Sequence, residues 1–346
     1  MAIVDNSALS ARMKERVKDY QKIFSLKSAN GFKQAKKFLT TWKIDQKGAL
    51  KRNSLGNLTQ PGLTGSINNQ ANFMQHKERP ALLSPAKVDL YLGEIALEDL
   101  RNSFLNTIQS ADVNDIYSIA GANYIMDMVM KQIGKEVNAA IWKGALGYVD
   151  TGVNETAWQG GLNLFDGFAV KMLKGYATSG SGWVGDIPGG NKVVSPASSV
   201  TKANILAELT KIRDIIFDTP ELNEVAMSGE EEDKSTLIIP PSHYKHMVTA
   251  LDELPYKKDQ LIELSSEPGV YQFKLMPDVK IKGASFMNQV DNMWWSPDNN
   301  RFWLSPLGAD DITSILFEKL GRGIQILIDW KQNVDYADGR LNVLHK

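Results

Sequence analysis

The stretch that decides the fold is Asp112–Gly144, DVNDIYSIAGANYIMDMVMKQIGKEVNAAIWKG. Asp112 is a favoured helix N-cap, and a glycine at 144 or 147 suits a helix C-terminus. Apolar residues recur at helical spacing along one face. They are Ile116, Ile119, Ala120, Tyr124, Met128, Val129, Ile133, Val137, Ala140 and Ile141. At 1.5 Å per residue the stretch predicts a helix roughly 50 Å long, which is typical of a rigid structural beam.

The region before this helix begins with a basic segment. Residues 1–52 hold 13 Lys or Arg and 4 Asp or Glu, whereas the rest of the chain holds 26 and 36. Spacings of three and four predict an amphipathic helix over 8–24 with Ser7 as N-cap, and a second short helix over 31–41. The polar face of the first helix carries Arg12, Lys14, Arg16, Lys18 and Lys22. This face suits acidic neighbours or nucleic acid, and a solvated helix explains it equally well.

An uncharged segment follows the basic region. Residues 53–76 contain no Asp, Glu, Lys or Arg. Disorder usually accompanies low hydrophobicity and high charge, yet apolar residues are spread through this segment. They are Leu55, Leu58, Leu63, Ile67 and Phe73. We interpret it as an arm that becomes ordered on another surface, with a flexible linker as the alternative.

Beyond the long helix the pattern is first mixed and then rich in β-strands. Helices are predicted over 165–177, 202–217 and 242–254, a strand over 236–239, and a surface loop over 178–199. Strands are predicted over 270–275, 279–287 and 323–330. A hairpin is expected to pair 293–295 with 301–304, bringing Trp294, Trp295 and Trp303 together as a structural aromatic group.

A search for catalytic or metal-binding chemistry gives little. The chain has no cysteine and only four histidines, which argues against disulfides, thiolate metal sites and histidine-rich centres. Gly180–Gly185 spells GxGxxG but lacks the strand before it and the helix after it. His243 and His246 are expected to be an exposed pair at a helix start rather than metal ligands. The carboxylate clusters at 230–233 and 310–311 are predicted to be solvated surface.

The order of elements resembles the major capsid proteins of tailed double-stranded DNA bacteriophages, which have the Hong Kong 97-like shell fold. Trp142-Lys143-Gly144 is similar to the family's end of the spine helix, and Leu164-Phe165-Asp166-Gly167-Phe168 to its entry into the next helix. Leu237-Ile238-Ile239-Pro240 before a helix, followed by a β-rich tail, completes the order.

This resemblance implies an α+β fold with five parts. They are a basic helical N-arm over 1–41, an extended loop over 42–92, a peripheral domain with the spine helix over 93–150, an axial domain over 151–275 with a Gly/Ser-rich insertion at 178–199, and a β-rich return to the peripheral domain over 276–346. Because only about forty residues precede the loop, we expect no fused scaffold of the usual size.

The resemblance also implies a function. It predicts a non-enzymatic protein that self-assembles through hexamers and pentamers into the icosahedral shell around phage DNA. Many copies of itself, packaged DNA bound without sequence preference, and portal, scaffolding and decoration proteins are the implied partners. No cofactor and no membrane are expected, and the implied location is the virion capsid, assembled in the host cytoplasm.

Three alternatives remain at the level of sequence. An encapsulin-type cellular shell that houses cargo would have the same fold. An α/β enzyme would use the 165–260 region and predicts a pocket with convergent carboxylates. A nucleic-acid-binding module led by residues 9–52 predicts tight, salt-dependent binding by the soluble monomer.

Overall fold

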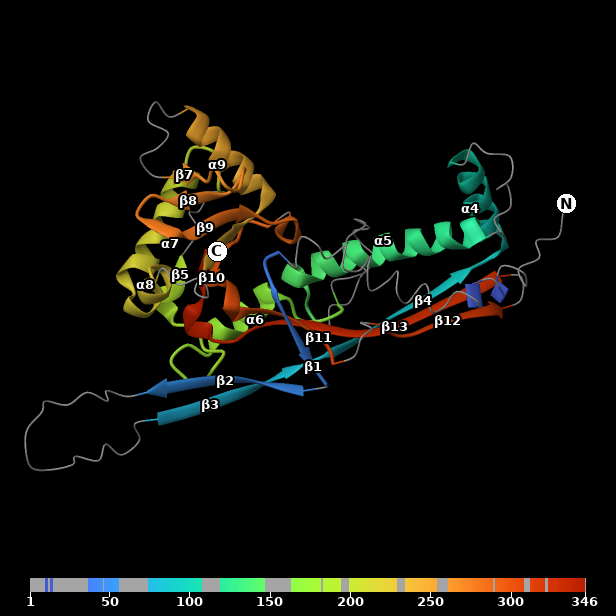
Figure 1. Cartoon of the computed structure of the whole chain (residues 1–346), viewed down its shortest axis with the longest axis horizontal. Helices are drawn as coiled ribbons and strands as arrows, with labels where there is room; N and C mark the ends of the chain where they lie inside the picture. The colour runs from blue at the N-terminus through green and yellow to red at the C-terminus, as the bar shows by residue number, and fades with distance from the viewer. Residues whose placement is uncertain are drawn as a thin grey trace, which may run out of the picture.

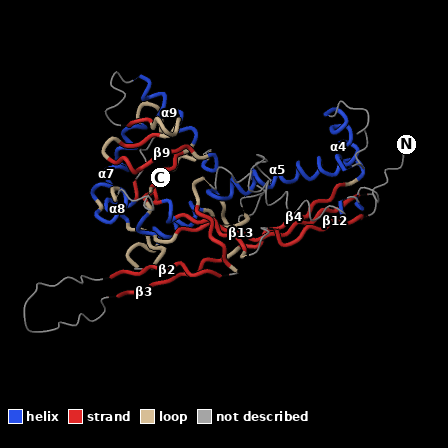
Figure 2. Tube along the Cα trace, in the orientation of Figure 1, coloured by secondary structure: helices blue, strands red, loops and turns tan. Residues whose placement is uncertain are grey.

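The computed structural model describes residues 10–11, 13–14, 37–45, 47–55, 74–107, 119–146, 163–181, 183–193, 199–228, 234–253, 261–288, 290–307, 312–320 and 323–345. Within these residues the chain forms a long sheet along a long helix, a compact α/β unit at one end, and a two-stranded arm (Figures 1 and 2). In the same residues no helix is both long enough and apolar enough to span a bilayer.

The long part is built on β13 (Gly323–Tyr336), which pairs with β4 (Ser84–Leu92) on one side. On its other side, the first part of β13 pairs with β12 (Ile312–Leu320), and its last residues pair with β11 (Arg301–Pro306). Strand β1 (Thr40–Ile44) pairs with β11 in parallel. Alternate residues of β13, from Ile324 to Trp330, are buried. Helix α5 (Ile119–Lys143) runs along this sheet, and α4 (Glu94–Thr107) lies at its far end (Figure 1).

The backbone at the end of α5 explains why Gly144 and Gly167, which lie in two of the segments that resemble the capsid family, are glycines. The Gly144 amide donates to the Ala140 carbonyl at 2.9 Å, and the Gly167 amide donates to the Gly144 carbonyl at 2.8 Å. A Cβ on Gly144 would lie 2.3 Å from the Phe165 carbonyl oxygen, and one on Gly167 would lie 2.5 Å from that of Ala140. The two backbones are therefore in contact where α5 ends and α6 (Phe168–Ala177) begins, and only glycine fits there.

The compact unit is built on a seven-stranded sheet of order β5-β14-β10-β6-β9-β8-β7. Its strands are β5 (Lys192–Val193), β6 (Ser235–Ile239), β7 (Leu261–Glu263), β8 (Tyr271–Phe273), β9 (Met276–Gly283), β10 (Met293–Pro297) and β14 (Val343–His345). Its helices are α7 (Ile205–Asp218), α8 (Pro220–Ala226) and α9 (Pro241–Glu253). Every residue of β6 and β10 is buried, so the sheet is covered on both faces.

The arm consists of β2 (Lys47–Leu55) and β3 (Met74–Leu82), paired antiparallel from Lys47 opposite Leu82 to Leu55 opposite Met74. Only Leu83 separates β3 from β4, so the arm and the long sheet share almost one continuous strand. Figure 1 shows the arm extending away from the rest of the molecule.

Several sequence predictions need correction. The proposed hairpin does not exist: β10 pairs with β6 and β14, whereas β11 pairs with β1 and β13, so the two runs belong to different sheets. The helix predicted over 31–41 is wrong at its end, because Thr40 and Thr41 begin β1. The predicted buried face of α5 is confirmed from Ile133 onward, but earlier in the helix Met126 and Met130 are buried and Met128 is 44% exposed.

The loop predicted over 178–199 is only partly a surface loop. Val184, Ile187 and Val193 are buried, and β5 joins the seven-stranded sheet. Its GxGxxG spelling is followed by no helix at 186–188, as expected. The predicted helices over 202–217 and 242–254 and the strand over 236–239 are confirmed within a few residues.

Some of the predicted features lie outside the described residues. They include the start of the long helix at Asp112 and the carboxylate clusters at 230–233 and 310–311. The helix predicted over 8–24 is described only at 10–11 and 13–14, where it is helical.

Candidate assembly surfaces

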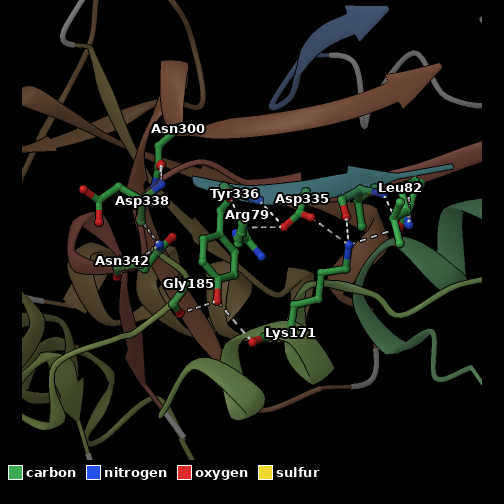
Figure 3. A network of polar contacts seen from close by, with 12 residues as sticks. Arg79, Leu82, Lys171, Gly185, Asn300, Asp335, Tyr336, Asp338 and Asn342 are labelled. Atoms are coloured by element: carbon green, nitrogen blue, oxygen red, sulfur yellow. Dashed lines mark hydrogen bonds and ion pairs between the residues drawn. The ribbon is translucent and has the colours of Figure 1, made fainter. Parts of the chain in front are cut away.

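The root of the arm is a buried network of charged groups (Figure 3). Arg79 on β3 is 7% exposed, and its guanidinium Nη2 donates to Asp335 Oδ1 at 2.7 Å. The same nitrogen also donates to the backbone carbonyl of Tyr336. Lys171 on α6 supplies a second cation, with its Nζ 3.2 Å from the other Asp335 oxygen. One carboxylate on β13 thus balances cations from the arm and from α6.

The amide and carbonyl groups around this carboxylate are also used. Lys171 donates to Asn333 Oδ1 at 3.2 Å and to the Val334 carbonyl. The Asn333 side-chain amide donates to the Leu82 carbonyl at 2.7 Å and to Ser84 Oγ at 3.3 Å. The point where β3 passes into β4 is therefore hydrogen-bonded to β13, which in turn is bonded to α6.

Aromatic rings cover the Arg79 guanidinium. Its Cζ lies 4.6 Å from the Tyr336 ring centroid and 5.3 Å from that of Trp183. The Tyr336 hydroxyl donates toward the Gly185 carbonyl at 2.9 Å and the Lys171 carbonyl at 3.2 Å. Burial raises the pKa of Tyr336, so its hydroxyl stays a donor at neutral pH. Burial lowers the pKa of Lys171, and the negative charge of Asp335 opposes this lowering.

A small apolar cluster supports the root from β1 and β11. Its buried members are Ile44, Leu50, Ala81 and Leu304, with Trp42, Leu83, Phe302 and Ala337 packed against them. Farther along the arm, Lys51, His76 and Glu78 are exposed. The described part of the arm is therefore packed on the molecule only at its root.

An apolar groove of about 570 Å³ lies between α5 and β4. Its lining includes Val88 and Leu90 from β4, Leu100 from α4, and Met128 and Val129 from α5. Lys131 and Lys135 also line it and are exposed, whereas Glu136 accepts a hydrogen bond from Gln132 at 2.8 Å. This is an apolar surface that the described part of the chain leaves open.

Most residues of the two predicted arm sites lie outside the described residues. Lys14 is exposed on a helical fragment whose neighbour Met13 is fully buried. Leu55 is the last described residue of β2, opposite Met74. The residues that are not described are Arg12, Arg16, Lys18, Lys22, Leu58, Leu63, Ile67 and Phe73.

The histidine prediction is wrong for His243. This residue is 1% exposed rather than at the surface, because it faces the interior from the first turn of α9. Among the described residues no group of three or more His, Asp or Glu side chains could hold a metal ion. Sequence reasoning missed Arg79 altogether: β-strand alternation puts Lys77, Arg79 and Ala81 on one face, and nothing in the sequence separates Arg79 from Lys77.

No protein-family model and no curated protein matches the chain. Solved structures do. The capsid of an empty GTA particle matches with a TM-score of 0.51 at 10% identity, over 90% of this chain and 95% of that one. The satellite phage P4 procapsid matches with a TM-score of 0.48 at 11% identity, over 90% and 93%. An encapsulin complex from Synechococcus elongatus PCC 7942 matches with a TM-score of 0.45 at 9% identity, over 90% and 85%. The first likeness establishes the α+β capsid-shell fold expected from the sequence.

Proposed function

We propose that the chain is a major capsid protein that self-assembles into the icosahedral shell enclosing the double-stranded DNA of a tailed phage. The arm carries this proposal. A two-stranded ribbon alone is at best marginally stable in water, and the described part of this one is packed on its own molecule only at the root. It therefore needs a surface supplied by another molecule.

The buried root supports the idea that this other molecule is a second copy. Arg79 and Asp335 fix where the arm leaves the long sheet, so each copy extends its arm in the same direction. A contact between an arm and a different surface of the next copy is heterologous, and such contacts close into rings when the rotation permits. Hexamers and pentamers are rings of this kind.

The apolar residues of the uncharged segment are the proposed anchors in the neighbour. Leu55, Leu58, Leu63, Ile67 and Phe73 would be buried on the adjacent copy. The open groove beside α5 supports this view, because it is an apolar surface that the described part of one chain leaves uncovered.

The basic N-terminal segment is proposed to contact packaged DNA through phosphates, or acidic neighbouring copies. Exposed Lys14 beside buried Met13 is consistent with a helix that packs by one face and presents its cations on the other. In this proposal the protein has no catalytic residue and resides in the virion capsid after assembly in the host cytoplasm. Portal, scaffolding and decoration proteins are the remaining proposed partners.

The test is electron microscopy of the purified full chain, with size-exclusion chromatography, produced alone and with candidate scaffolding proteins. Closed, regular particles are expected. A chain that stays monomeric under all these conditions contradicts the proposal, and a particle that retains an enzyme instead of DNA would assign it to the cellular shells.

A variant isolates the role of the arm. Because Leu55 pairs with Met74, replacing residues 56–73 by Asn-Gly closes the hairpin with a two-residue turn and preserves both strands. This variant is expected to fold but not to assemble. Lys174→Ala, at a side chain 63% exposed on α6, serves as the control that assembles. Normal particles from the closed hairpin would rule out the arm as the joining element.

A further inference from the structure

One edge of the long sheet is left unpaired by the described part of the chain. Over Ser84–Leu92, β4 pairs with β13, and β12 lies on the other side of β13. No described strand pairs with the second edge of β4 (Figure 1). Such an edge presents a row of backbone N–H and C=O groups that can pair with a strand of another molecule. The second edge of β4 is therefore suited to dock an extended segment.

The side chains of β4 alternate between the two faces of the sheet. On the face toward α5, Ala86 and Leu92 are buried, and Val88 is half-buried in the wall of the apolar groove. The opposite face is exposed and carries one cation and one carboxylate, Lys87 and Asp89. A strand that pairs with this edge must therefore supply apolar side chains on one face and complementary charges on the other.

The strand is its own complement when a second copy runs antiparallel to it. With the pair centred on Val88, Lys87 lies opposite the partner's Asp89, and Asp89 lies opposite the partner's Lys87. On the face toward α5, Val88 meets the partner's Val88, and Ala86 meets the partner's Leu90. Because directly opposite side chains lie close together on one face, this register brings opposite charges together on one face and apolar side chains together on the other.

The opposite border of the sheet does not have this property. The charged residues of β12, Glu318 and Lys319, are adjacent in sequence and therefore point to opposite faces of the sheet. Two β12 strands paired in the same way would bring no opposite charges together. A lysine on an edge strand usually hinders pairing with other strands, but in β4 a second copy supplies the carboxylate that it needs. The charge pattern therefore favours a second copy of β4 as the partner.

The neighbours of these charges within one chain leave the pairing open. Asp89 Oδ1 accepts a hydrogen bond from the side chain of Gln325 on β13 at 2.7 Å, so the carboxylate is held beside the strand and Oδ2 is the atom that would accept from the partner's Lys87. Tyr91 is 51% exposed and in this register would lie opposite the partner's Pro85. An apolar contact would thus stand at each end of the charged pairs.

We propose that β4 pairs with β4 of a second copy, antiparallel and centred on Val88, so that the long sheets of two copies form one continuous sheet. Both copies use the same surface, so the contact is isologous and ends at a pair. The arm contact proposed above is heterologous and forms rings, and a second, pairwise contact of this kind would join one ring to another. The pairing of β4 does not itself depend on the arm or on the shell.

The test is cross-linking of the purified full chain, with or without particles. The chain has no cysteine, so Val88→Cys places one reactive group at the proposed two-fold axis. A short bis-maleimide is expected to join these chains through position 88 of both copies, as read by peptide mass spectrometry. Leu316→Cys, at a side chain 43% exposed on β12, is the control that is expected to stay unlinked. No linking at position 88, or equal linking at both positions, would overturn the proposal.

Charge-swapped variants test the register, each made in the Val88→Cys chain. Lys87→Asp alone places carboxylates opposite Asp89 at both ends of the pair, and Asp89→Lys alone places two lysines there. Each is expected to lower the yield of linked chains by roughly tenfold. The double variant restores opposite charges, and so does an equimolar mixture of the two single variants, so both are expected to recover the yield. Single variants without effect, or a loss that neither combination repairs, would contradict the proposal.

Discussion

The compact unit and the root of the arm are stabilised by different kinds of contact. The core of the compact unit is apolar, with side chains such as Ile212, Leu237 and Ile281 fully buried. The arm root instead buries Arg79 and Asp335 as a charged pair. Apolar contacts are non-directional, whereas charged hydrogen bonds have fixed geometry.

The difference suggests separate roles for the two regions. Burying an ion pair adds little net stability compared with apolar residues of similar size, but breaking one partner is costly. The apolar core of the compact unit therefore contributes more to the free energy of unfolding than the arm root does. The arm root accounts for the direction in which the arm leaves the molecule, and the assembly that we propose depends on that direction.

The largest effect on stability is expected from Trp294→Ala, where β10 of the compact unit packs against α6, the helix that also carries Lys171 of the arm root. Trp294 is fully buried, its ring centroid lies 4.5 Å from that of Phe168, and its indole donates to Asn342 Oδ1 at 3.0 Å. Removing the ring should lower the free energy of unfolding by about 5 kcal/mol, at the upper end of the usual cost. Chemical denaturation should show both regions destabilised together; loss of the compact unit alone would show that they fold independently.

The second-largest loss of stability is expected from Asp335→Asn. The change leaves Arg79 and Lys171 as buried cations without a balancing charge, at a cost of about 3–4 kcal/mol in unfolding free energy. The triple variant Arg79→Met, Lys171→Met and Asp335→Leu should recover most of that stability, as measured by denaturation, and still assemble poorly by electron microscopy. A triple variant that assembles normally would show that the charged groups of the root are not needed for the proposed assembly.

A smaller effect is expected from Tyr336→Phe. Its hydroxyl donates toward the Gly185 carbonyl at 2.9 Å, and losing this buried hydrogen bond should cost about 1–2 kcal/mol. Thermal unfolding measures this loss. An unchanged melting temperature would mean that water replaces the hydroxyl.

The smallest effect is expected from Trp183→Ala. Trp183 is 40% exposed and contributes one of the two rings over Arg79, so the loss should be about 0.5–1 kcal/mol. Chemical denaturation measures this loss. A loss above about 2 kcal/mol would show that Trp183 holds the guanidinium more strongly than a half-exposed ring does.

The sequence predicts which helices and strands form better than it predicts which strands pair with one another. Local periodicity locates α5, α7 and α9 because each has an apolar face of helical spacing. The pairing of β10 with β6 and β14 depends on residues about fifty positions away in sequence, which no local pattern encodes. The proposed hairpin failed for this reason.

The arm root could not be predicted from the sequence for a related reason. Arg79 and Asp335 are 256 positions apart, and each stands among other charged residues. The burial of His243 could not be predicted either, because a single histidine at the start of a helix gives no sign that it will be buried in the compact unit. Only the glycines at 144 and 167 gave a local signal, because a backbone contact demands the residue without a side chain.

The most direct test of the central claim is the distance distribution between a spin label on the arm and one on the compact unit. The chain has no cysteine, so Lys51→Cys and Glu224→Cys place the two labels at exposed positions without other changes. Labelled chains diluted with unlabelled ones are measured by pulsed electron–electron double resonance. A single narrow distribution that broadens in the triple apolar variant is predicted. A broad distribution in the wild type would contradict a root that fixes the arm.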